Sequence, residues 1–76
     1  MFTFKVVFHD SGEVLTSVAY YKYPHTAMAA VKRFLNGRLK YNQSQPMDIV
    51  SVFIYDVLGN EVVERRRTNV AIDKIT

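Results

Sequence analysis

The sequence contains no cysteine, so neither a disulfide nor a thiolate metal site can stabilise this 76-residue chain. Small domains often rely on such cross-links, because a short chain buries only a modest part of its surface. The two histidines lie far apart and match no zinc-binding spacing, and no cofactor is expected. Stability must therefore come from an apolar core, for which five Tyr and five Phe residues are available, or from association between copies.

Long apolar runs are also missing. None approaches the roughly 20 residues that a helix needs to span a bilayer. The first residues do not have the charged, apolar and small-residue regions of a signal peptide. We therefore expect a cytoplasmic protein that does not enter a membrane.

Acidic residues are absent between positions 14 and 46, although the chain has seven of them and a net charge of +3. A solvated helix usually mixes charges of both signs. The cations of this span must therefore pair with distant acids, remain in water or meet an anionic partner. They are Lys22, Lys32, Arg33, Arg38 and Lys40.

No recognisable catalytic or phosphate-binding motif is present, and we expect a protein that is not an enzyme. His9, Asp10 and Ser11 have the residue types of a hydrolase triad, but adjacent residues in one turn cannot adopt its geometry. The three glycines are isolated and form no phosphate-binding loop. We interpret the acidic residues of the second half as charges at strand ends that limit aggregation: Asp48, Asp56, Glu61 and Glu64.

Residues 24–40 are the only segment with a clear helical period. Their apolar positions recur at spacings of three and four, which predicts a helix with one buried face. Pro24 suits the first turn, where its missing N–H costs nothing. Gly37 is a possible end, although Leu39 stays in phase with Leu35. The predicted buried face comprises Ala27, Met28, Val31, Phe34, Leu35 and Leu39.

The remaining segments have the patterns of strands and turns. Residues 2–8 alternate with an aromatic inner face, and residues 9–12 have turn chemistry. Residues 13–23 read as a second strand that is apolar on both faces, which favours a central or covered position. A second hairpin is expected over residues 48–68, and the tail 69–76 could extend the last strand, add a fifth or fray.

The order hairpin 2–23, helix 24–40, hairpin 48–68 predicts a single domain, 1–76. The simplest arrangement is an α+β two-layer sandwich in which one helix packs on one face of a four-stranded antiparallel sheet.

One helix covers only one face of such a sheet, which suggests that the other face binds a partner. Our candidates for this protein-binding face are Val7, Tyr21, Phe53 and Tyr55. We therefore predict a small module that binds a protein, with an inhibitor, an adaptor and a homodimer left open as forms of that function. In size and in its lack of catalytic chemistry, the chain is similar to small inhibitors encoded by viruses and mobile elements.

The alternative is a nucleic-acid-binding domain. Cations would contact phosphates, and tyrosines near the helix would stack on bases. The competing interpretation is a solvated helix face and a charged edge strand. The candidate cations for an anionic partner are Lys32, Arg33, Arg38, Lys40, Arg65, Arg66 and Arg67, and the tyrosines are Tyr20, Tyr21, Tyr23 and Tyr41.

Overall fold

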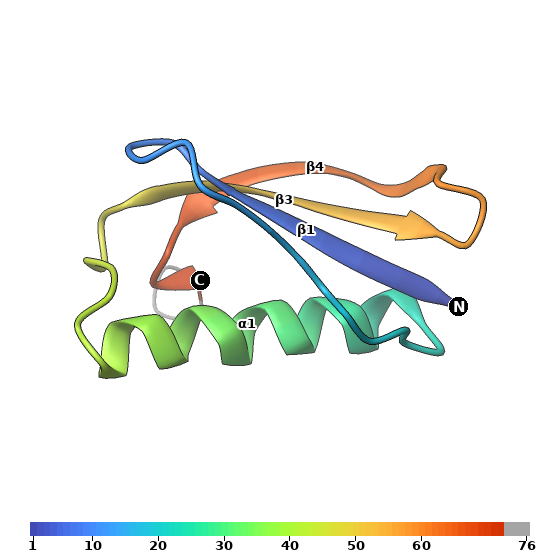
Figure 1. Ribbon diagram of the computed structural model, residues 1–76, viewed down its shortest axis with the longest axis horizontal. Coiled ribbons are helices and arrows are strands. Elements are labelled where there is room, and N and C mark those ends of the chain that lie inside the picture. The colour runs from blue at the N-terminus through green and yellow to red at the C-terminus, as the bar shows by residue number, and fades with distance from the viewer. Residues whose placement is uncertain (73–76) are drawn as a thin grey trace.

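A computed structural model describes residues 1–72, with the side chains of residues 63–65 left out of the description. The elements follow the order β1 (Phe2–Phe8), β2 (Val14–Thr16), α1 (Pro24–Lys40), β3 (Ile49–Asp56) and β4 (Glu61–Asn69). The four strands form one antiparallel sheet, and α1 lies across one face of it (Figure 1). The predicted α+β two-layer sandwich is confirmed.

The strand order in the sheet is β2-β1-β3-β4. The two middle strands, β1 and β3, pair with each other along the whole of β1. Val6 lies opposite Val52, and Phe4 lies opposite Ile54. Because side chains alternate between the faces of a strand, these residues share the face that α1 covers. All of them are at most 9% exposed.

The core fills the space between α1 and this inner face of the sheet. Burying one valine, leucine, isoleucine or phenylalanine side chain contributes about 1.5–3 kcal/mol. This packing stabilises a helix that would be marginal alone. Phe8 and Phe34 meet edge to face, with ring centroids 6.5 Å apart. The buried core residues are Phe4, Val6, Phe8, Ala27, Ala30, Val31, Leu35, Val50, Val52, Ile54, Val70 and Ile72.

Helix α1 has the bounds expected from the sequence. Pro24 occupies its first turn, and the helix continues through Gly37 to Lys40, with Leu39 packed against the core. The N–H of Tyr41 donates to the carbonyl of Gly37, which satisfies one of the last helical acceptors. The helix therefore follows its apolar period and does not end at the glycine.

The second strand is much shorter than predicted and lies at the edge of the sheet. It ends at Thr16, because the Ser17 hydroxyl accepts from the N–H of Phe4 at 3.1 Å and takes the place of a ladder carbonyl. Ser17 also donates its N–H to the Phe4 carbonyl at 2.9 Å, and after Ser17 the backbone pairs with β1 again at the bridge between Tyr21 and Phe2. The apolar residues between these points therefore do not build a covered strand, and Val18 is fully exposed.

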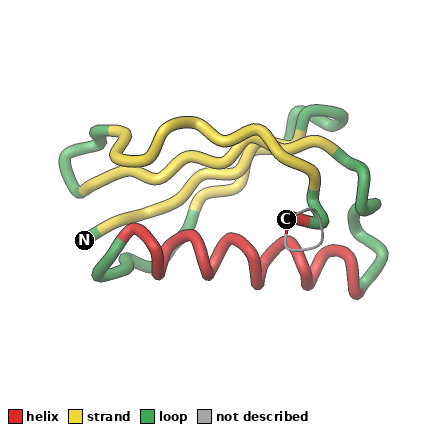
Figure 2. Tube along the Cα trace, turned by 180° about the vertical axis from the view of Figure 1, so that it is seen from behind, coloured by secondary structure: helices red, strands yellow, loops and turns green. Residues whose placement is uncertain are grey.

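The start of the predicted tail turns toward the helix. The N–H of Val70 donates to the carbonyl of Asp48 at 2.8 Å, and that of Ala71 donates to Pro46 at 3.2 Å. Val70, Ala71 and Ile72 are at most 5% exposed. In Figures 1 and 2 this segment lies between the sheet and α1, so it completes the core on the β4 side. The rest of the tail, residues 73–76, lies outside the described residues.

The turn between β3 and β4 is organised by Asp56. Its carboxylate accepts from the backbone N–H groups of Asn60 and Leu58, both at 2.9 Å. The hydrogen bond from the Asn60 N–H, followed by that from Leu58, lowers the pKa of Asp56 below its usual 3.8, although partial desolvation opposes the shift. Gly59 follows with a φ of 85°, which favours glycine.

We expect Asp56→Asn to lower the melting temperature at neutral pH, because the neutral amide accepts these N–H bonds more weakly. The native pKa lies below the unfolded value, so the stabilisation is complete above the unfolded pKa and is lost as the pH falls through the native pKa. The melting temperatures of the two proteins should therefore converge in acid, below about pH 3.8. The control is Asp10→Asn, in the turn between β1 and β2. Its melting temperature should match that of wild type at neutral pH and in acid. A gap between wild type and Asp56→Asn that stays constant into acid would contradict this explanation.

Among the residues that the structure describes, no helix is both long enough and apolar enough to cross a membrane.

Candidate binding surface

The sheet face that points away from α1, which we call the outer face, is covered by no described element. Figures 1 and 2 show α1 and residues 70–72 together on the opposite side of the sheet. The strand registers and the alternation of side chains assign the residues of the outer face. They are Thr3, Lys5 and Val7 of β1, Val14 and Thr16 of β2, Ile49, Ser51, Phe53 and Tyr55 of β3, and Glu61, Arg67 and Asn69 of β4.

The centre of the outer face holds two stacked aromatic rings and a cation. The rings of Phe53 and Tyr55 lie 6.1 Å apart, with an angle of 9° between their planes. Lys5 is the direct neighbour of Phe53 on β1, and its Nζ lies 4.7 Å from the Phe53 ring and 5.5 Å from the Tyr55 ring. Such contacts hold the aliphatic stem of the lysine along the rings. The result is a flat, partly exposed aromatic surface with a positive charge on it.

Apolar and polar groups flank this aromatic pair. Val7 lies opposite Val14, which is 53% exposed at the edge of the sheet. Beside Val7, Nε2 of His9 lies 2.7 Å from the Ser51 hydroxyl. This pair has the spacing of a base and a nucleophile, but Ser51 is only 1% exposed, so its hydroxyl is not accessible to a substrate. The contact satisfies a buried polar group.

The structure places three of the four predicted protein-binding residues on the outer face and moves the fourth. Val7, Phe53 and Tyr55 are there, as their strand positions require. Tyr21 is not, and that placement was wrong. Its ring lies 6.2 Å from that of Phe4 and packs against the core, because its bridge to Phe2 puts both residues on the helix side.

The predicted basic residues do not form one surface. Lys32, Arg33 and Lys40 lie on α1, whereas Arg66 and Arg67 lie on β4 and are exposed. Since α1 packs against the inner face, its solvated side points away from the sheet. The side chain of Arg65 lies outside the described residues. One ligand cannot contact the helix cations and the outer face together without wrapping around the domain.

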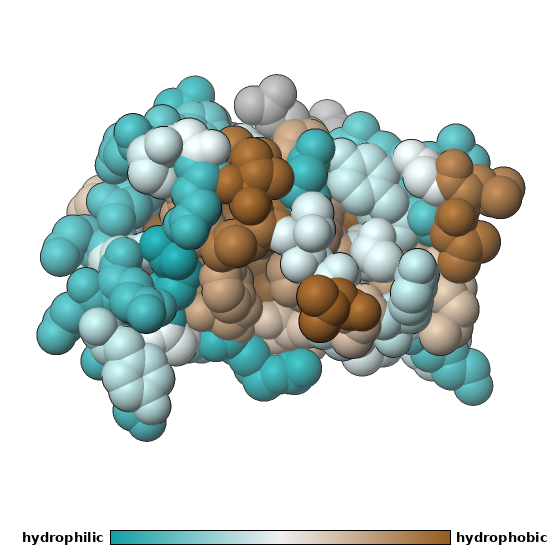
Figure 3. All heavy atoms as spheres, in the orientation of Figure 1, coloured by the Kyte–Doolittle hydropathy of each residue, from teal (hydrophilic) through white to brown (hydrophobic). Residues whose placement is uncertain are grey.

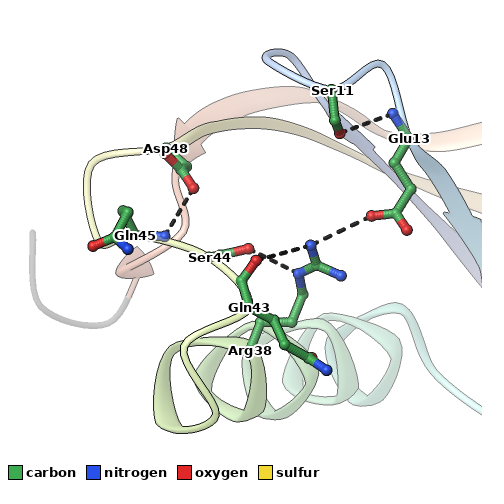
Figure 4. Close-up of polar contacts among 7 residues, drawn as sticks. All are labelled: Ser11, Glu13, Arg38, Gln43, Ser44, Gln45 and Asp48. Carbon is green, nitrogen blue, oxygen red and sulfur yellow. Dashed lines mark hydrogen bonds and ion pairs between the residues drawn. The ribbon is translucent and has the colours of Figure 1, made fainter.

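Arg38 has a structural role that the sequence did not reveal. Its Nε donates to the Ser44 hydroxyl at 2.8 Å, and a terminal nitrogen lies 3.3 Å from Oε1 of Glu13 (Figure 4). The same guanidinium group lies 4.2 Å from the centroid of the Phe8 ring. Arg38 thus joins the end of α1 to the loop after it and to the first hairpin. It is engaged within the molecule, and its predicted contact with an anionic partner stays a prediction.

Depressions also lie outside the outer face. A cavity of about 120 Å³ lies beside Arg38 and is lined mainly by polar residues of the adjoining loops. A second, more apolar depression of about 250 Å³ lies between α1 and the segment after β2, and Figure 3 shows brown surface on this side of the molecule. Its apolar lining includes Phe4, Leu15, Val18, Tyr21 and Phe34.

The other tyrosines named in the sequence are exposed near the ends of α1. Tyr20, Tyr23 and Tyr41 are 62%, 48% and 69% exposed. Tyr23 stacks on His25 at the start of the helix, with centroids 5.3 Å apart. Tyr23 and Tyr41 flank α1, which lies on the side of the sheet opposite to the aromatic pair of β3. No group of three or more His, Cys, Asp or Glu side chains among the described residues could hold a metal ion.

Comparisons of the chain with models of protein families, with curated proteins and with solved structures found no significant match. The candidate surface therefore rests on the residues and contacts of this chain alone.

Proposed function

We propose that this chain is a small non-enzymatic binding module whose outer face binds a protein partner. The observation that carries the proposal is the stacked pair Phe53–Tyr55 on a sheet face that no described element covers. Aromatic residues are enriched in protein interfaces, where large rigid side chains contribute much of the binding energy. The proposal includes the cytoplasmic location and the inhibitor or adaptor role expected from the sequence.

The mixture of groups on the outer face supports an interface that forms and dissociates. The aromatic pair and Val7 supply an apolar centre with Lys5 on it, while Glu61 and Arg67 supply charges of both signs around it. A polar rim around an apolar centre is the usual arrangement of interfaces between proteins that also exist alone. The rim carries both signs of charge, and the positive Lys5 at the centre favours a partner with an acidic residue at the matching position.

The experiment is affinity isolation from the organism that encodes the chain, with quantitative mass spectrometry of the bound proteins. We expect a partner that wild type retains and that a Phe53→Ala, Tyr55→Ala double variant loses by at least about tenfold. The matched control replaces the two exposed tyrosines that flank α1, Tyr23 and Tyr41, and should retain it. Titration of the purified partner then measures the affinity for each variant. Equal affinity of wild type and the outer-face variant would refute the proposal.

A second candidate, binding of single-stranded nucleic acid, is favoured by one specific observation. Lys5 lies against both stacked rings. Arg67 lies on the same face, on β4, the strand next to the one that carries the rings. Single-stranded RNA and DNA bind to sheets by stacking bases on aromatic side chains while cations contact the phosphates. This candidate uses the outer face and not the helix cations named from the sequence.

Fluorescence anisotropy with labelled single-stranded RNA and DNA separates the two candidates. Nucleic-acid binding predicts an affinity that falls steeply with salt and falls further in a Lys5→Ala, Arg67→Ala variant. An Arg33→Ala, Lys40→Ala variant removes two helix cations and should bind like wild type. A flat titration at low salt would exclude this second candidate and leave the protein partner as the remaining proposal.

A further inference from the structure

Strand β4 is the long edge of the sheet, and its pairing with β3 shifts register between Val52 and Ile54 and again between Ile54 and Tyr55. It spans nine residues, Glu61–Asn69, and it stands last in the strand order. The opposite edge strand, β2, has only three residues. Among the described residues, no strand pairs with the free side of β4, so its outward backbone groups face solvent. Such an edge can accept another strand unless its side chains prevent it.

The charges along β4 are ordered, with acidic residues first and basic residues last. Glu61 and Glu64 come before the three arginines 65–67. Glu61, Arg66 and Arg67 are exposed, and none has an ion-pair partner within the described part of the chain. If two parallel copies of this strand met, like charges would face one another. In an antiparallel pair, the acidic start of one strand faces the basic end of the other.

The register within the sheet adds that Glu61 and Arg67 point to the same face. Glu61 is the partner of Tyr55 and Arg67 is the partner of Ser51, and both of those residues are on the outer face. In a two-fold symmetric pair of edges, the outer faces of the copies are continuous. In the register that sets Glu61 beside Arg67 of the partner subunit, this attractive pair occurs twice, and Glu64 lies opposite its own copy at the two-fold axis. Opposite charges across neighbouring strands stabilise pairing, and like charges oppose it.

We propose that two copies of this chain associate through antiparallel pairing of their β4 edges. The two four-stranded sheets then form one continuous sheet, with both helices on one side and both outer faces on the other. Charged residues usually protect an edge from pairing. Here their order opposes an in-register parallel copy but allows an antiparallel copy of the chain. The proposal does not depend on what the outer face binds; a dimer of this kind presents two aromatic pairs on one surface.

The test uses sedimentation velocity of the full chain over a wide range of concentrations. Wild type should form dimers that dissociate on dilution and at high salt, because the contacts are charged and exposed. Glu61→Arg alone and Arg67→Glu alone should each weaken self-association by about tenfold, since both symmetric contacts become repulsive. An Arg33→Glu control changes a helix charge by the same amount and should still dimerise. Circular dichroism confirms that each variant is folded.

A mixture of the two single variants gives the decisive result. One copy then presents glutamate at both positions and the other presents arginine at both, so an antiparallel pair of unlike copies regains two attractive contacts. We expect heterodimers from proteins that do not self-associate. A monomeric wild type at every concentration, or a mixture that stays monomeric while wild type dimerises, would overturn the proposal. The Phe53→Ala, Tyr55→Ala variant should remain dimeric, so failure of the partner proposal is distinguishable from failure of this one.

Discussion

Leu35→Ala is expected to lower the free energy of unfolding by about 2–5 kcal/mol, which is the range for removing a buried leucine and leaving a cavity. Leu35 is 0% exposed and is among the largest fully buried side chains of the core. It lies in the second half of α1, on the side of the helix that packs against the sheet. A domain of this size has a total stability of about 5–15 kcal/mol, so the loss is a large fraction of the whole.

Urea denaturation followed by circular dichroism measures this effect. The matched control is Arg33→Ala, two residues earlier on the exposed side of the same helix, which should change stability by less than about 0.5 kcal/mol. A loss below about 1 kcal/mol for Leu35→Ala would mean that the helix does not depend on packing against the sheet.

Arg38→Ala is expected to cost about 2–3 kcal/mol, because it removes several contacts that join separate segments. The Ser44 hydroxyl, in a residue that is 7% exposed, would lose its charged donor, and the ring of Phe8 would lose its cover. Arg38 itself is largely buried, with a side chain 17% exposed. The substitution therefore leaves the buried Ser44 hydroxyl without its donor. It also exposes the apolar ring of Phe8 to water.

Two further variants separate the sources of this stability. Glu13→Gln should have little effect, because Glu13 is 44% exposed and solvent screens its ion pair with Arg38. Arg38→Lys should restore only part of the loss, since an ammonium group cannot bond Ser44 and cover a ring with one planar surface. Thermal denaturation of the three variants tests this order. A full rescue by lysine would show that charge alone matters at this position.

The helix and its packing were predictable from the sequence because their signals are local. The apolar period from Ala27 to Leu39 fixes which side of α1 is buried, and Pro24 marks its first turn. Strand β1 also follows its alternation, with Phe4, Val6 and Phe8 inside. These patterns depend only on the geometry of one helix or strand, so neighbouring residues contain the information.

The errors arose where contacts between distant residues decided the structure. The Ser17 hydroxyl ended β2 early by bonding to β1, and the bridge to Phe2 turned Tyr21 inward. The buried position of Val70 depends on a bond to Asp48 in another loop. An apolar pattern gives no information about these pairings, because they require a known strand register.

The candidate site was predicted in part for the same reason. Phe53 and Tyr55 share a strand face by simple alternation, so their common placement was available from the sequence. Lys5 was missed as a site residue. Alternation along β1 was a usable signal, because it places Lys5 on the face that does not carry the phenylalanines. Only the register, which pairs Lys5 with Phe53, shows that the cation and the rings meet. Likewise, the loop contacts of Arg38 could not be read from a run of cations.

The outer face of the sheet is, in our proposal, the surface that meets a partner. Site-specific photocrosslinking in cells of the organism that encodes the chain tests this most directly. A photoreactive amino acid at position 55 reports on the outer face, and the same group at position 41, near the end of α1, is the exposed control. We predict a discrete crosslinked species at position 55 and none at position 41. Crosslinks at position 41 with none at position 55 would contradict the account.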